Sequence, residues 1–159
     1  MTTQGGVPNT LRVVVLAKGS RTPLKSVVVL VTLIVPYKNN YTIGPTLTDD
    51  SGQVCFTRDE MVQEVELCQK HSPMDYSAGL GEMTGVEVRV PDAEGIDRLL
   101  KASDWWGIGV PEWRLSGETI GRLRCAPNRL YMAATARVSR AEFTKDLRVT
   151  VLLEPLAQV

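Results

Sequence analysis

The 159 residues of this chain are enough for one domain with a substantial hydrophobic core and too few for two. Eighteen basic residues balance eighteen acidic ones, so no overall charge draws the chain to nucleic acid or an anionic membrane, and we expect neither partner. Hydrophobic residues make up 43% and charged residues 23%, as in ordinary soluble globular proteins.

The first half of the chain predicts short strands separated by turns. The first ten residues lack the charged and apolar segments of a signal peptide, so residues 1–10 are expected to be a flexible tail on a cytoplasmic protein. Runs of β-branched residues predict two strands, and the second is apolar throughout, which indicates a central strand covered on both faces. A third strand interrupted at Gly44-Pro45 and a brief fourth strand follow; the four are expected at 11–17, 27–35, 41–48 and 53–56.

A helix is expected immediately after the fourth strand, at 58–70. Thr57 and Glu60 stand three residues apart, as a capping box requires, and Phe56 and Met61 flank them as a hydrophobic staple. His71-Ser72-Pro73 ends the helix, because the residue before a proline avoids the α region. The sequence therefore predicts a docked helix with defined ends.

The second half of the chain predicts a loop, a second helix and four more strands. Residues 74–84 contain two glycines and no periodicity, which indicates the loop. The helix is expected at 92–104, with Ile96 and Leu99 on its buried face. Alternating apolar and polar residues predict strands at 86–90, 118–124, 130–138 and 147–153, with Leu130 and Met132 facing inward in the third of these.

Many short strands with two helices inserted mid-chain predict a mainly β fold, a mostly antiparallel β-sandwich in one domain spanning 11–155. The segment 11–56 also resembles a transthyretin-like (prealbumin-like) sandwich, of which carboxypeptidase-regulatory modules are relatives. The matching features are an opening strand, Gly19 and Pro23-Leu24 before the second strand, and Thr48-Asp49-Asp50-Ser51-Gly52 before the fourth. This resemblance implies Greek-key connections between the strands.

The residues that carry chemistry are few. His71 is the only histidine, whereas ring-opening hydrolases of the transthyretin fold use several and intradiol dioxygenases of a similar sandwich need two for iron. Asp49-Asp50 lacks the spacing of a calcium loop. We therefore expect no metal, no cofactor and no assigned catalytic residue, and the three cysteines are expected to be buried, reduced thiols. An enzyme built on His71, Asp75 and Tyr76 is the third functional hypothesis.

Trp105, Trp106 and Trp113 lie together in a segment rich in glycine and proline. Tryptophan offers a large apolar face and an N–H donor, which suits sugars and protein partners, but it also serves to close the open end of a sandwich. The second hypothesis is thus a small-ligand or carbohydrate-binding domain that uses these tryptophans, with His71 and Tyr76 nearby. The first hypothesis is a non-enzymatic module with a structural or protein-interaction role, through self-association or another protein partner.

Overall fold

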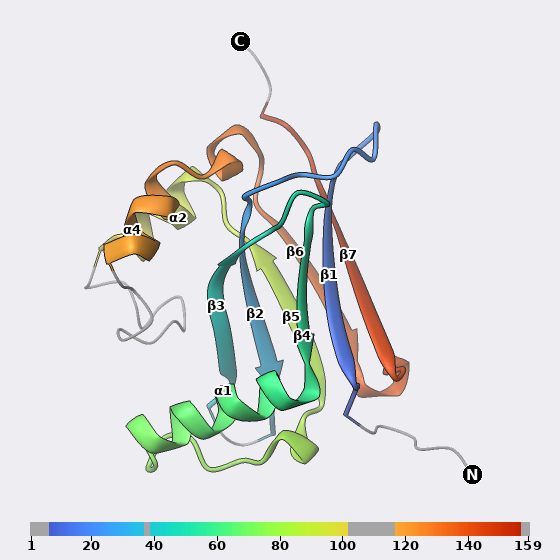
Figure 1. Ribbon diagram of the computed structural model, residues 1–159, viewed down its shortest axis with the longest axis vertical. Coiled ribbons are helices and arrows are strands. Elements are labelled where there is room, and N and C mark those ends of the chain that lie inside the picture. The colour runs from blue at the N-terminus through green and yellow to red at the C-terminus, as the bar shows by residue number, and fades with distance from the viewer. Residues whose placement is uncertain (1–6, 37–38, 102–116, 157–159) are drawn as a thin grey trace.

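The computed structural model describes residues 7–36, 39–101 and 117–156. These residues form seven strands in two sheets together with three α-helices, so the protein is mainly β, as predicted (Figure 1). The expected inserted helices near 58–70 and 92–104 are both present, and the third helix occupies a segment that we predicted to be a strand.

The two sheets contain three and four strands. The three-stranded sheet has the order β4 (Gln53–Thr57), β1 (Thr10–Ala17), β7 (Asp146–Leu153); β1 runs antiparallel to β4 and parallel to β7. The four-stranded sheet has the order β3 (Tyr41–Leu47), β2 (Val28–Ile34), β5 (Gly85–Val90), β6 (Ala134–Ser139), and each of its pairings is antiparallel. The predicted preference for antiparallel pairing is therefore confirmed, with β1–β7 as the exception.

Alternate side chains of both sheets meet in one hydrophobic cluster. The alternation predicted for the last strand is confirmed, since Leu147, Val149, Val151 and Leu153 are buried while the residues between them are exposed. They pack in the same cluster as the inward side chains of the other strands, among them Leu11, Val13, Val15, Val29, Val31, Leu33, Val86 and Val88.

The opposite face of β2 is covered as well. Val28 and Leu30 pack in a second cluster with side chains from α2 (Ala93–Leu99), from α4 (Gly117–Arg124) and from the turn that follows; these are Ile96, Leu99, Leu123 and Ala126. Figure 1 shows α2 and α4 together beside one end of the four-stranded sheet. The prediction that the second strand is central and covered on both faces is therefore confirmed.

A buried amide ties this second cluster to β2. Asn128 lies in the 3₁₀ turn η4 (Pro127–Leu130) and is fully buried. Its side-chain oxygen accepts a hydrogen bond from the Val28 N–H at 2.7 Å, and its side-chain nitrogen donates to the carbonyls of Val28 and Pro91 at 3.0 and 2.8 Å. The last β2–β5 pair at this end of the sheet is Leu30 with Arg89. Beyond it, the Asn128 amide bonds to the peptide groups of Val28 in the place that a further residue of β5 would take.

The predicted helix cap is confirmed in detail. Helix α1 (Arg58–His71) begins after Thr57, whose side chain accepts from the Glu60 N–H, while the Glu60 carboxylate accepts from the Thr57 N–H at 3.0 Å. Phe56 and Met61 both lie in the main hydrophobic cluster. In Figure 1, α1 crosses one end of the two sheets.

Three predicted boundaries or element types are wrong. Residues 118–124 form the helix α4 and not a strand; Glu118 and Arg122, four residues apart, form an ion pair at 2.7 Å along its surface. The second helix ends at Leu99 rather than 104, although residues 102–104 lie outside the described part. Strand β6 begins at Ala134 because residues 127–130 form a 3₁₀ turn, so Leu130 and Met132 are exposed instead of facing inward.

The expectation of buried cysteines is also wrong for two of the three. Cys68 lies on the buried face of α1, but Cys55 and Cys125 are exposed, and all three are free thiols. Cys55 alternates with the buried Val54 and Phe56 along β4, and this alternation places it on the outer face of the sheet.

The turn before β4 makes stability depend on pH. The Asp49 carboxylate accepts from the Gln53 N–H at 3.0 Å and from the Ser51 hydroxyl at 2.7 Å, and these bonds hold its pKa below the usual range. The stabilisation is therefore present above the pKa of an unfolded aspartate, about 3.9, and is lost as the pH falls through the lower folded pKa.

We expect Asp49→Asn to lower the free energy of unfolding at neutral pH, because the neutral amide accepts weaker hydrogen bonds than a carboxylate. The difference from the unsubstituted protein should shrink as the pH falls below about 4. Denaturant titrations at a series of pH values would measure it. A difference that stays constant down to about pH 2 would contradict the role of the carboxylate charge.

Candidate functional site

The edges of the two sheets are the first places to look for a binding site, because an edge strand presents N–H and C=O groups that can pair with another chain. The four edges are β3, β4, β6 and β7. They differ in how many of their outward groups are already hydrogen-bonded.

The outer edge of β4 is nearly closed. The Val15 N–H donates to the Gly52 carbonyl, so alternation directs the peptide groups of Gln53, Cys55 and Thr57 away from β1. The Gln53 N–H donates to the Asp49 carboxylate, and the Gln53 carbonyl accepts from the Asp49 N–H. The Thr57 N–H donates to the Glu60 carboxylate. Among these three residues, only Cys55 keeps both of its peptide groups open.

The edges of β3 and β6 are also limited. Pro45 lies within β3 and has no N–H, and the register with β2 shifts between Val29 and Val31. In β6 the Arg140 N–H donates to the Thr84 carbonyl, so Thr135, Arg137 and Ser139 face outward. The Ser139 N–H is bonded to the Glu142 carboxylate at 3.0 Å. Strand β6 thus keeps two residues with both groups open.

Strand β7 has the longest open edge. The Leu153 carbonyl accepts from the Lys18 N–H, so residues with odd numbers in β7 face β1 and those with even numbers face outward. No hydrogen bond joins the N–H or C=O groups of Arg148, Thr150 or Leu152 to any described residue. In Figure 1, β7 borders the outside of the ribbon.

The open stretch of β7 has a defined limit at each end. The Asp146 carbonyl already accepts from the Thr144 hydroxyl at 3.1 Å. At the other end the Glu154 carbonyl accepts from the Met132 N–H at 2.8 Å, and the Leu156 N–H donates to the Leu130 carbonyl at 3.0 Å. The segment 130–132 therefore occupies the edge beyond Leu153, and the open stretch is 146–152.

An exposed apolar patch lies where this open stretch ends. In the described part of the chain six large hydrophobic side chains are exposed, and four of them belong to the segments 130–132 and 152–156. We call these four the corner patch: Leu130, Met132, Leu152 and Leu156, which are 65%, 49%, 39% and 48% exposed. Apolar side chains gathered next to open peptide groups are typical of an interaction surface.

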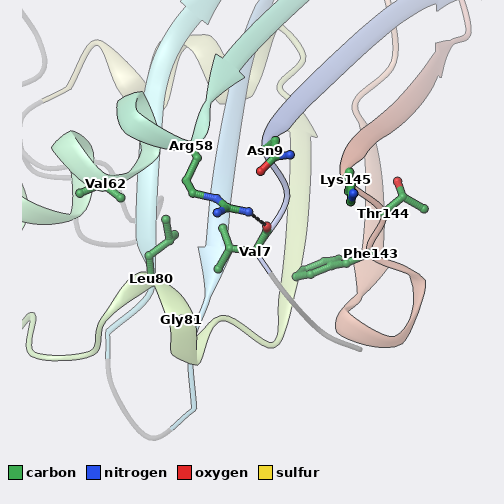
Figure 2. Close-up of a pocket in the computed structure, with 9 residues that line it drawn as sticks. All are labelled: Val7, Asn9, Arg58, Val62, Leu80, Gly81, Phe143, Thr144 and Lys145. Carbon is green, nitrogen blue, oxygen red and sulfur yellow. Dashed lines mark hydrogen bonds between the residues drawn. The ribbon is translucent and has the colours of Figure 1, made fainter. Parts of the chain in front are cut away.

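An open pocket of about 530 Å³ lies near the start of β7 (Figure 2). Its lining comes from the segment before β1, the start of α1, the turn η1 (Leu80–Glu82) and the residues before β7. The Arg58 guanidinium donates to the carbonyls of Val7 and Pro8, and Figure 2 shows Val7 between Leu80 and Phe143. The N-terminal segment thus forms one wall of the pocket, and the N–H groups of Asn9 and Thr10 donate to the Lys145 carbonyl, so residues 7–10 are hydrogen-bonded to the rest of the domain; residues 1–6 lie outside the described part.

The predicted residues of a His71-centred enzyme lie at the end of α1 and in the segment that follows it. His71 is exposed at the end of α1, and Asp75 accepts from the Ser72 hydroxyl. Tyr76 stacks on the buried Tyr41, with ring centroids 5.4 Å apart. Burial raises the pKa of Tyr41, whose hydroxyl donates to the Ala78 carbonyl. Neither His71 nor Tyr76 lines the pocket of Figure 2.

The other predicted ligand residues, Trp105, Trp106 and Trp113, lie outside the described residues. Within the described ranges no group of three or more His, Cys, Asp or Glu side chains is placed to hold a metal ion. Over the same ranges no helix has the length and apolar character needed to cross a membrane.

Sequence reasoning missed the open edge of β7 and the corner patch. Pro45 in the third predicted strand was a signal for one edge of a sheet, because proline is confined to edge strands. No comparable signal marks β7. A scan against protein-family models finds no match to this chain, and a search of curated proteins finds no similar sequence.

Proposed function

We propose that this protein is a non-enzymatic, protein-binding module that accepts an additional β-strand at the open edge of β7. The observation that carries the proposal is the set of unpaired N–H and C=O groups on Arg148, Thr150 and Leu152. An extended segment that lies along this edge would continue the three-stranded sheet, and its main-chain hydrogen bonds would supply affinity for the partner.

The contrast between the edges supports this proposal. Strand β4 ends in a turn and a helix cap that use its outward groups, and β3 contains a proline, whereas β7 carries neither device over seven residues. Natural proteins usually protect a long edge strand from other chains. An edge that lacks these devices and lies beside exposed apolar side chains is therefore better explained by a partner than by chance.

The fold belongs to the same proposal. We propose that the two sheets stack as a Greek-key β-sandwich of the transthyretin-like type in one domain spanning 11–155. Its support is the strand order β4-β1-β7 and β3-β2-β5-β6, together with the cluster of side chains shared by both sheets. We also propose a cytoplasmic location, since three free thiols, two of them exposed, suit a reducing compartment.

The test is a proline substitution in β7. Thr150→Pro removes an outward N–H that bonds to no described residue, so the sheet should tolerate it, while the ring obstructs an added strand. The probe is a lysine-flanked peptide of alternating threonine and valine, titrated into ¹⁵N-labelled protein. We expect the amide resonances of residues 146–152 to shift in the unsubstituted protein and to remain unchanged in Thr150→Pro.

Thr135→Pro is the matched control, because Thr135 also has an outward N–H, but on the edge of β6. This variant should keep the peptide-induced shifts at 146–152. Circular dichroism would establish that both variants are folded. Shifts that are equal in all three proteins, or that occur away from β7, would contradict strand addition at this edge.

A further inference from the structure

Two arginines lie side by side on the outer face of the three-stranded sheet. Arg12 of β1 and Arg148 of β7 are partners in the parallel register, and both side chains are exposed. Residues paired in this way on neighbouring strands project from the same face of the sheet. On the other side of β1 the same row continues to Cys55 of β4. The row therefore reaches the open edge of β7 with two neighbouring positive charges.

Neither of these charges is neutralised by a contacting carboxylate, since the ion pairs among the described residues include neither Arg12 nor Arg148. The Arg12 guanidinium donates to the neutral side-chain oxygen of Gln53 at 3.2 Å. Arg12 also attracts the Asp49 carboxylate, but that group is hydrogen-bonded within its own turn. Asp146, on the outer face two residues before Arg148, accepts from a hydroxyl of β1 at 2.7 Å.

The exposed arginine at the edge of the other sheet lies beside a negative charge. Arg137 of β6 is opposite Glu87 of β5 in the antiparallel register. Opposite charges on neighbouring strands stabilise a sheet, whereas like charges repel each other. Arg148 has Arg12 as its partner on one side and an open edge on the other. A strand added at this edge is thus placed to supply the negative charge that the row lacks.

Resting on the proposed function, we infer that the partner of β7 is an extended segment of another protein that carries an acidic side chain opposite Arg148. The Arg148 peptide groups point away from β1, so an antiparallel strand bonded to them places one of its residues directly opposite, on the outer face. A carboxylate at this position extends the row and attracts both arginines. A segment of five residues, opposite 146–150, makes these contacts and ends short of the edge that residues 130–132 occupy.

Two peptides that differ in one side chain test this inference. Each has serine flanks around the order threonine, valine, central residue, valine, threonine, and the central residue is glutamate in one and glutamine in the other. Titration into ¹⁵N-labelled protein, followed through the amide resonances of residues 146–152, gives a dissociation constant for each peptide. At low ionic strength we expect the glutamate peptide to bind about three to five times more tightly, and the difference should shrink at high salt.

Two variants locate the preference for glutamate. Arg148→Gln should bind both peptides equally, whereas Arg137→Gln, the matched control on β6, should keep the preference; both side chains are exposed, so both variants should fold. Peptides that shift the β7 amides with equal affinity, or a preference that survives in Arg148→Gln, would overturn the inference and leave strand addition standing. Amides that respond to neither peptide would overturn both. Shifts of the same amides when the protein alone is concentrated would assign the edge to a second copy and overturn the inference.

Discussion

Asn128→Ala is expected to lower the free energy of unfolding by roughly 3 to 5 kcal/mol. The substitution removes three hydrogen bonds and leaves the Val28 N–H and the carbonyls of Val28 and Pro91 without the amide that pairs with them in the second cluster. A buried peptide group that loses its partner costs the full penalty of its removal from water. Denaturant titration followed by circular dichroism measures the change.

Two further variants test whether the loss of stability comes from the hydrogen bonds of Asn128 and not from any substitution in this turn. Asn128→Asp keeps an acceptor for Val28 but loses both donors and buries a charge, so it should be at least as damaging as alanine. Arg129→Ala removes a surface ion pair to Asp97 at 3.0 Å and should cost less than about 1 kcal/mol. If Asn128→Ala is no worse than Arg129→Ala, the amide does not tie η4 to β2.

Met61→Ala is expected to cost roughly 2 to 5 kcal/mol, because the side chain is fully buried between α1 and the sheets and its removal leaves a cavity. Its position one turn into α1 also places it next to Phe56 in the hydrophobic staple. Thermal and denaturant unfolding of the variant would measure the loss.

The same helix supplies the graded controls for Met61. Thr57→Ala removes one half of the capping box and should cost about 1 kcal/mol. Glu66→Ala lies on the exposed face and should have little effect. Equal and negligible effects in all three variants would show that α1 is not docked on the sheets.

Local signals in the sequence predicted those parts of the fold that short-range chemistry determines. The capping box at Thr57 and Glu60 requires only four neighbouring residues, and it marks the start of α1 correctly. The alternation from Leu147 to Leu153 has a period of two that only a strand with one buried face satisfies.

The errors occurred where the period was ambiguous. Residues 118–124 contain just two large apolar residues, Ile120 and Leu123. A single spacing of three residues is too little to distinguish a helix from a strand. In the structure the spacing is helical, and Leu123 is the side chain that reaches the second cluster. The alternation around Cys55 already placed it opposite Val54 and Phe56, so its exposure could have been predicted from the same pattern.

The candidate site could not be predicted, because an edge is a property of strand order. Nothing within residues 146–153 distinguishes a strand with one neighbour from a strand with two, since both alternate in the same way. The open edge follows from the parallel pairing with β1 and from the turn that returns residues 130–132 to Glu154, and both contacts join distant parts of the chain. Asn128 is likewise defined by partners at positions 28 and 91.

The parallel pairing of β1 with β7 also bears on how the protein is made. Thr10 of β1 pairs with Asp146 of β7. Because these residues are far apart in the sequence, β1 is synthesised long before β7, the second strand with which it pairs. Contacts this distant in sequence slow folding, since the loop between them must close first. Until then the apolar strand β1 has an open edge of its own, and such an edge makes a partly folded chain prone to aggregate.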